Sequence, residues 1–169
     1  MLYKPVIIEQ IHEEVEGFKT FTFQQGHGIK YKAGQYITFV KKNIDEEIRR
    51  SYSIVSSPQL NEPLTIGVKR IDNGFFSRHL IDHAKIGDEI LTTGAGGFFT
   101  LPEDLSQVQQ IFFLAAGSGI TPIYSLLKTV LHFYPKIHVV LIYSNPSPAK
   151  TIFYAQLNAL KQTFGERFH

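Results

Sequence analysis

The hydrophobic pattern of this sequence changes at about Pro102, and that change constrains the fold more than any other feature. Before it, apolar and polar residues alternate in short runs, as in FKTFTFQQ at residues 18–25. After it, the run QIFFLAA at Gln110–Ala116 is apolar without interruption. Alternation is typical of strands with one face in water, whereas a short continuous apolar run is typical of a strand buried on both faces. Two architectures are therefore expected in this chain of 169 residues.

The first architecture consists of short strands separated by turns. Gly, Pro, Asn or Asp stands in most of the gaps, as is usual for turns. One helix is expected at 75–83, directly after Asp72-Asn73-Gly74. We predict a six-stranded antiparallel Greek-key β-barrel with one capping helix. The expected strands are 4–11, 17–24, 35–41, 50–57, 64–70 and 88–92.

The second architecture alternates strands and helices. The glycine-containing segment Gly117–Pro122 follows the first buried strand and leads into an amphipathic helix that is expected to end near Phe133. A second buried strand follows at His138–Tyr143, and a further helix is expected at 151–163. This β-α-β-α order predicts the opening part of a doubly wound α/β nucleotide-binding domain.

The boundary between the two architectures is placed within residues 103–108, EDLSQV. We predict a β-barrel domain at 1–104 and the N-terminal part of an α/β domain at 105–169. Two parallel strands with two helices would leave an apolar sheet edge exposed, which complete domains avoid. The pattern therefore predicts that the chain is a fragment of a longer polypeptide.

Charge and hydropathy argue against two classes of partner. Seventeen Lys and Arg against 15 Asp and Glu give a net charge of +2 without a basic block, so no nucleic acid is expected as a partner. The longest apolar runs fall short of the ~20 residues that span a bilayer, and the first residues lack the apolar core of a signal peptide. We therefore expect a soluble cytoplasmic protein with no membrane contact.

The metal-binding residues are few. The sequence has no cysteine, which excludes disulfides, thiolate zinc sites and a cysteine-ligated iron–sulfur cluster in this chain. His79 and His83 stand four residues apart on the expected helix, a spacing compatible with metal binding. No third ligand accompanies them, so exposed helix histidines are the favoured interpretation and no metal site is predicted.

The segment Arg50-Ser51-Tyr52-Ser53 places a cation, an aromatic ring and a hydroxyl within four residues. On a strand, Arg50 and Tyr52 share one face, while Ser51 and Ser53 share the other. A guanidinium can hold a phosphate through two hydrogen bonds, and a phenol ring can stack on a planar heterocycle. The segment suits a ligand with a phosphate and a flat ring. Taken alone, it is better explained as an edge strand with a solvated arginine.

Two further segments stand at expected helix entrances, where free backbone N–H groups and the helix dipole attract anions. Gly74-Phe75-Phe76-Ser77 begins one helix, and an ordinary turn and cap explains it equally well. Gly117–Pro122 begins the other, and its glycines would let a pyrophosphate approach the backbone. Local structure offers an alternative, with Thr121 as the helix cap and Pro122 in the first turn. Pro122 also replaces the third glycine of the standard dinucleotide-binding fingerprint.

The order and spacing of these three segments resemble the ferredoxin–NADP⁺ reductase superfamily of flavoproteins, over essentially the whole chain. The closest resemblance is to the reductase components of bacterial oxygenases of the phenylacetyl-CoA oxygenase type. It implies that Arg50 contacts the FAD pyrophosphate, that Tyr52 lies against the isoalloxazine and that Ser53 hydrogen-bonds near its N5. Tyr52 and Ser53 are thus the implied catalytic residues. The other implied FAD-binding residues are Ser51, Val68, Lys69, Ile71, Gly74, Phe75, Phe76 and Ser77.

The resemblance also implies a site for NADH or NADPH as electron donor. Gly117, Gly119, Thr121 and Pro122 match the family's G-x-G-x-x-P loop, and Thr121 is expected near the contact between flavin and nicotinamide. The implied partners are an iron–sulfur domain or ferredoxin-like acceptor and an oxygenase. The cysteine-ligated cluster that accompanies such reductases cannot belong to this chain, because the chain has no cysteine.

Two alternatives of other classes stay open. The first is a non-catalytic module that binds flavin or a partner protein and lacks a competent nicotinamide site. The second is an enzyme of another kind, such as a nucleotide-dependent transferase, that uses only the β-α-β part. A flavin spectrum excludes the second, and rapid reduction of the flavin by NADH separates the first from a reductase.

Overall fold

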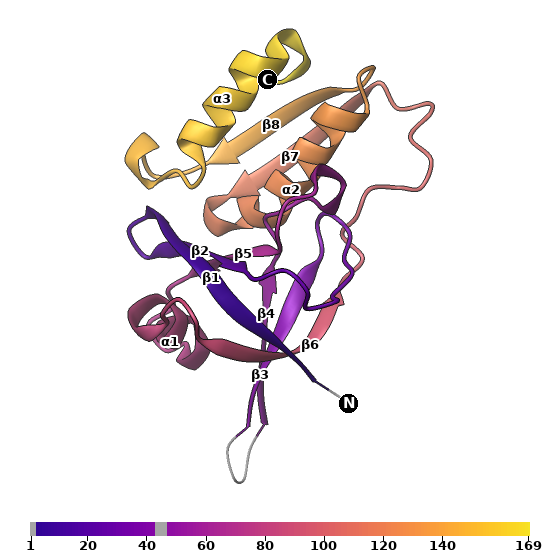
Figure 1. The fold of residues 1–169 in the computed structure, drawn as a ribbon. Helices are drawn as coiled ribbons and strands as arrows, with labels where there is room; N and C mark the ends of the chain where they lie inside the picture. Colours follow the sequence, from indigo (N-terminus) through magenta and orange to yellow (C-terminus); the bar gives the residue numbers. More distant parts are fainter. Residues whose placement is uncertain (1–2, 43–46) are drawn as a thin grey trace.

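The computed structural model describes residues 3–42 and 47–169, which form an antiparallel sheet of six strands and a parallel sheet of two (Figure 1). The expected strands are confirmed with ends shifted by a few residues, and the expected helix α1 is found at Phe75–His83. The six antiparallel strands are β1 (Lys4–Val15), β2 (Phe18–Phe23), β3 (Tyr36–Lys42), β4 (Glu47–Ser53), β5 (Thr65–Lys69) and β6 (Glu89–Gly96).

The antiparallel sheet curls around its core in the order β4-β3-β6-β1-β2-β5. Its two edge strands meet only at a single bridge between Ile54 and Ile66, supported by a 2.8 Å hydrogen bond from Val55 N to Thr65 O. The antiparallel fold class is therefore confirmed. The expected closed barrel is corrected in one respect, because no continuous ladder joins β4 to β5 within the described residues.

Alternating side chains of these strands fill one apolar core. Phe23 and Phe39 face each other across it with ring centroids 5.7 Å apart, edge to face. Both are fully buried, as are Ile37 and Ile66. Leu80 of α1 packs against the same cluster, so the helix covers one part of the core. The period-two pattern of the sequence thus corresponds to side chains that point inward and outward in turn.

The parallel sheet consists of β7 (Gln110–Ala116) and β8 (His138–Ser144), with α2 (Ile120–Phe133) and α3 (Tyr154–Phe164) packed against it. Side chains of both helices belong to the same apolar cluster as Phe113 and Val139, so both helices cover the same face. On the other face, Phe112, Leu114 and Ile142 are 58–70% exposed. The expectation that these strands are buried on both faces is therefore wrong for the described residues.

Helix α2 is the longest helix described, with 14 residues. Among the described residues, no helix combines the length and apolarity needed to cross a membrane. Arg167 binds the C-terminal end of α2, because its guanidinium donates to Leu131 O at 3.1 Å and to Tyr134 O at 2.9 Å. A cation at this end satisfies helix carbonyls and complements the helix dipole.

The two sheets share one apolar cluster, to which Phe18 of β2 contributes from the antiparallel side. Its ring lies edge-on to Phe153 at 6.0 Å, and Phe153 in turn stacks on Tyr124 of α2 at 4.6 Å. Phe153 is 3% exposed and has a left-handed backbone with φ of 61°. Such a conformation costs about 1–3 kcal/mol in a residue other than glycine, so the surrounding packing has to offset it. The division of the chain into a domain at 1–104 and a domain at 105–169 stays a prediction.

We predict that Phe18→Ala lowers the free energy of unfolding by about 3–5 kcal/mol, because it opens a cavity in the cluster that both sheets share. Urea denaturation followed by circular dichroism measures the change. Phe98→Ala is the matched control, because Phe98 is 103% exposed and its removal should change stability by no more than about 0.5 kcal/mol. Equal stability of the two variants would contradict the shared cluster.

Candidate functional site

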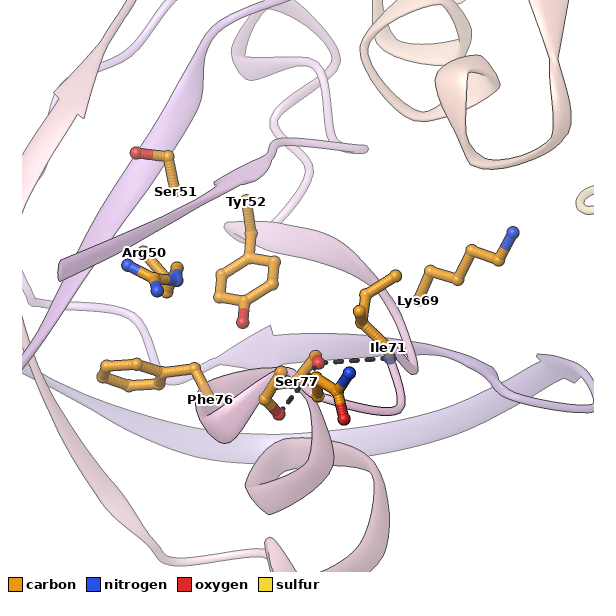
Figure 2. A pocket seen from close by; sticks show the side chains of 9 residues that line it. Arg50, Ser51, Tyr52, Lys69, Ile71, Phe76 and Ser77 are labelled. Atoms are coloured by element: carbon orange, nitrogen blue, oxygen red, sulfur yellow. Dashed lines mark hydrogen bonds between the residues drawn. The ribbon is translucent and has the colours of Figure 1, made fainter. Parts of the chain in front are cut away.

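A cavity of about 350 Å³ opens where β4, the end of β5 and the start of α1 come together (Figure 2). It unites two of the three segments that the sequence singled out, Arg50–Tyr52 and Gly74–Ser77. Lys69 and Ile71, for which the family resemblance implies FAD binding, line it as well. The complete lining consists of Arg50, Ser51, Tyr52, Lys69, Ile71, Asn73, Gly74, Phe76 and Ser77.

Strand β4 directs two side chains toward α1. Figure 2 shows Arg50 and Tyr52 pointing into the space between β4 and the helix, while Ser51 points away. Ser51 Oγ instead lies 2.8 Å from Thr38 Oγ1 on the neighbouring strand. Ser53 is not among the lining residues, and strand alternation places it on the same face as Ser51. Its predicted contact with a flavin stays a prediction.

Tyr52 forms the apolar wall of the cavity. Its ring packs 5.8 Å from that of Phe39 in the core. Burial raises the pKa of Tyr52 to about 12, and the nearby Arg50 opposes that rise only in part. The phenol is therefore neutral at physiological pH. It can offer a flat face and one hydrogen-bond donor, but it is not suited to proton transfer near neutrality.

The charge of the cavity is positive. Arg50 and Lys69 line it, and none of the described lining residues is a carboxylate. Arg50 donates to the carbonyl of Arg49 at 2.6 Å, and no carboxylate among the described residues forms an ion pair with it. Two cations without a matching anion favour a negatively charged ligand.

The entrance of α1 adds backbone donors. The first hydrogen bond of the helix runs from Arg78 N to Gly74 O at 3.0 Å, so the preceding three amides have no acceptor within the helix. Ser77 Oγ donates to Gly74 O and accepts from Ile71 N, each at 3.2 Å, which fixes the loop. A Cβ on Gly74 would collide with Ser77 Oγ. The loop is thus compact and presents amides to an anion.

An ion pair network holds this loop on its outer side. The guanidinium of Arg70 donates to Asp82 of α1 at 3.0 Å and to Asp72 at 2.9 Å. The hydrogen bond from Arg70 lowers the pKa of the Asp82 carboxyl. Asn73, which the sequence reasoning treated only as a turn residue, also lines the cavity. The sequence signal for its place in the cavity was its position directly before Gly74, the N-cap residue of α1.

Besides Ser53, two residues with a predicted role, Val68 and Phe75, do not line the cavity. Val68 is fully buried in the core of the antiparallel sheet, because β5 directs it inward and its neighbour Lys69 outward. Phe75 is 47% exposed and lies beneath Lys41 Nζ at 4.6 Å. The helix turns by about 100° per residue, which directs Phe75 away from the space that Phe76 lines.

The third segment lies elsewhere, at the junction of β7 and α2. Gly117–Gly119 forms a single 3₁₀ turn that continues into α2. A Cβ on Gly117 or on Gly119 would meet no atom within 4 Å, so the space beside both glycines is open. The hydroxyl of Tyr143 donates to Gly117 O at 2.8 Å and anchors the turn. The loop can therefore admit a ligand close to its backbone.

Thr121 differs from its predicted role as helix cap. It lies inside α2, where its hydroxyl donates to Ser118 O at 2.8 Å, and it is 2% exposed. The helix begins at Ile120 without a side-chain cap, because the 3₁₀ turn leads directly into it. Pro122 occupies the first turn, as predicted. Thr121 packs against Gly67 of β5, whose added Cβ would lie 2.9 Å from Thr121 Cγ2.

Strand β5 therefore lies between the two sites. Its last residue, Lys69, lines the cavity at α1, and Gly67 contacts the helix that follows the glycine loop. At the end of β8, Asn145 Oδ1 is buried without a hydrogen-bond partner in the described part of the chain.

Comparison with known proteins agrees with this geometry. Residues 6–101 match the oxidoreductase FAD-binding domain model, and residues 113–169 match the oxidoreductase NAD-binding domain model. The chain is 36% identical over 156 residues to an NADPH oxidoreductase of Mycobacterium tuberculosis, covering 89% of this chain and 40% of that protein. It is 28% identical over 169 residues to one of the subunits of the 1,2-phenylacetyl-CoA epoxidase of Escherichia coli, covering 98% and 47%. The chain spans less than half the length of these relatives.

A solved structure has the same fold. The ferredoxin–NADP⁺ reductase of Neisseria gonorrhoeae, with bound FAD and NADP, superposes with a TM-score of 0.82 and 27% identity, over 99% of this chain and 66% of that one. The resemblance inferred from the three sequence segments is thereby confirmed. Because the FAD-binding model matches more than half of its residues, the chain belongs to the oxidoreductase FAD-binding domain family, within the ferredoxin–NADP⁺ reductase superfamily.

Proposed function

We propose that this chain binds FAD between β4, β5 and α1 and acts as an NADH- or NADPH-dependent reductase. The observation that carries the proposal is the cavity that joins Arg50 and Tyr52 to the amides at the entrance of α1. It combines a cationic, carboxylate-free lining with an aromatic wall, as a ligand with phosphates and a flat ring requires. When bound, FAD would supply the redox chemistry, accepting a hydride from nicotinamide and releasing electrons singly.

The residues of the cavity have separate tasks in this proposal. Arg50 and the amides after Gly74 hold the phosphates, and Ser77 keeps the loop in shape through its bonds to Gly74 O and Ile71 N. The ring of Tyr52 bounds the flat part of the ligand. Ser53, at the rim of β4 on the opposite face, would reach the same ring only past the end of the strand.

We further propose that the loop Gly117–Pro122 binds the nicotinamide nucleotide. Open space beside Gly117 and Gly119 lets a pyrophosphate approach the backbone, and the start of α2 favours an anion. Thr121, which is buried against Gly67, shapes the contact between the loop and the antiparallel sheet instead of touching the nucleotide through its side chain.

The electron acceptor is proposed from the relatives. One of them is named as a component of phenylacetyl-CoA epoxidase, and others are named as reductase components of monooxygenases. An iron–sulfur domain or a ferredoxin-like protein that serves an oxygenase is the corresponding acceptor. It has to reach the chain from outside residues 1–169, because the sequence has no cysteine to bind a cluster.

The first test is the visible spectrum of the purified chain after incubation with FAD, followed by addition of NADH or NADPH without oxygen. We expect a yellow protein whose visible flavin absorbance is bleached by one of the two donors. Absence of bound flavin would contradict the proposal. A flavin that binds but stays oxidised would support the non-catalytic module instead.

The second test concerns Arg50. We expect Arg50→Ala to weaken FAD binding at least about tenfold, because a charge-assisted hydrogen bond to a phosphate contributes about 1.5–3 kcal/mol. Quenching of flavin fluorescence during titration measures the affinity. Arg49→Ala is the control, because Arg49 pairs with Glu47 at 2.6 Å and lies outside the cavity. Equal affinities of the two variants would remove Arg50 from the site.

The third test separates the two ligand sites. Gly119 has ordinary helical angles and open space around it, so Gly119→Ala should leave the fold intact or stabilise it by up to about 1 kcal/mol. The added methyl group would occupy the space that the nucleotide needs. We expect unchanged FAD affinity and a higher half-saturating concentration of NADH or NADPH in the reduction assay. An unchanged concentration would place the nucleotide elsewhere.

A further inference from the structure

One face of α2 is polar although it is buried against the antiparallel sheet. Thr121, Ser125, Lys128 and Thr129 recur at intervals that place them on the same side of the helix. Their exposures are 2%, 0%, 7% and 0%. Buried polar groups are costly unless each finds a hydrogen-bond partner. The surface that packs against this face therefore has to offer donors and acceptors at matching positions.

Two hydroxyl groups of this face, those of Ser125 and Thr129, find partners in the segment that follows β4. Ser125 Oγ donates to Ser56 O at 2.6 Å. Thr129 Oγ1 lies 2.7 Å from Ser57 Oγ, and both residues are fully buried. Ser57 is four residues beyond Ser53 in the sequence, so the strand that lines the flavin cavity continues directly into the surface on which α2 rests.

Lys128 completes the contact with an ion pair. Its ammonium lies 2.7 Å and 2.6 Å from the two carboxylate oxygens of Glu62, and 4.7 Å from the ring centre of Tyr124. Burial lowers the pKa of Lys128, and the neighbouring Glu62 acts against that shift. The carboxylate also accepts from Ser57 N at 2.7 Å. The carboxylate of Glu62 therefore links α2, through Lys128, to the segment that follows β4, through Ser57.

These contacts define one relative position of α2 and the antiparallel sheet. An apolar surface tolerates small sliding, because hydrophobic contact has no direction. Hydrogen bonds and ion pairs do have direction, and displacement of α2 along this surface would leave Ser125 Oγ and Lys128 buried without partners. Thr129 would keep only its bond within the helix, to Ser125 O at 2.8 Å. The glycine loop stands at the start of α2, so the same contacts determine where that loop lies.

We propose that this polar seam, formed by Ser125, Lys128 and Thr129 of α2 with Ser56, Ser57 and Glu62, holds the nucleotide loop in register with the flavin cavity. Lys128 is its principal positioning residue and touches neither ligand. The inference rests on the proposed function and adds a determinant of the hydride-transfer rate that lies outside both sites. A misplacement of about 1 Å between reacting groups can slow a reaction about 100-fold.

The kinetic test compares Lys128→Met with the unchanged chain in stopped-flow reduction of the flavin at saturating nucleotide. We expect the first-order rate constant to fall at least about tenfold, while FAD affinity and the flavin spectrum stay the same. Lys85→Met is the matched control, because Lys85 is exposed and lies outside the seam. Thr129→Val, which keeps the side-chain shape, should slow reduction about threefold and provides the test if Lys128→Met does not fold.

The positional test uses the absence of cysteine in the sequence, which lets two introduced cysteines be labelled selectively. Spin labels at Glu9→Cys on β1 and Asn158→Cys on α3 report the distance between the sheet and the α2–α3 layer, and both positions are exposed. We expect a narrow distance distribution in the parent and in Lys85→Met, and a broad or shifted one in Lys128→Met and in Thr129→Val.

Two results would overturn the proposal. Hydride transfer within twofold of the parent in both seam variants would show that the seam does not set the rate. Slower transfer with an unchanged, narrow distance distribution would show that Lys128 acts by another route than position. If the parent binds FAD but no donor reduces it, the proposed function fails separately, and the distance measurement still decides whether the seam fixes the register.

Discussion

The packing of α2 against the antiparallel sheet is the contact on which the rest of this structure depends. It joins an aromatic cluster, in which Phe153 lies between Phe18 and Tyr124, to the buried hydrogen bonds of Ser125 and Thr129. The aromatic part buries apolar area and therefore contributes stability. The polar part supplies direction. Because α2 begins at the loop Gly117–Pro122 and rests on the continuation of β4, this one contact relates the two proposed ligand sites.

The cavity exists because the antiparallel sheet is left open. The edge strands β4 and β5 meet at the bridge between Ile54 and Ile66. A ladder continued from that bridge in antiparallel register would pair Tyr52 with Val68. The paired backbones of β4 and β5 would then lie side by side, and no cavity could open between them. Instead the strands diverge, and the entrance of α1 stands beside the gap. The absence of closure at one edge thus provides a site with backbone donors on one side and side chains on the other.

Much of this arrangement follows from the sequence, and the exceptions have physical reasons. Period-two alternation predicted the antiparallel strands, and turn chemistry at Asp72-Asn73-Gly74 predicted α1 with the correct ends. The exposed face at Phe112 and Leu114 was not predicted, because an apolar run does not reveal how many of its faces are covered. The buried seam was not predicted either. Ser125, Lys128 and Thr129 follow the spacing of a solvated helix face, and only the tertiary contact shows that they are paired.

Gly67 gives independent evidence that the two sites are held close together. It lies in β5 with an ordinary strand conformation, so its backbone angles do not require glycine. Its surroundings do, since a Cβ there would come within 2.6 Å of Phe18 Cζ and 2.9 Å of Thr121 Cγ2. A side chain at this position would push the start of α2 away from β5, whose last residue lines the cavity at α1. The start of α2 is restrained at Thr121, which lies close against Gly67. About two turns further along, the helix is restrained again at Lys128, which pairs with Glu62. Together these two contacts restrain both the distance between α2 and the antiparallel sheet and the position of α2 along it.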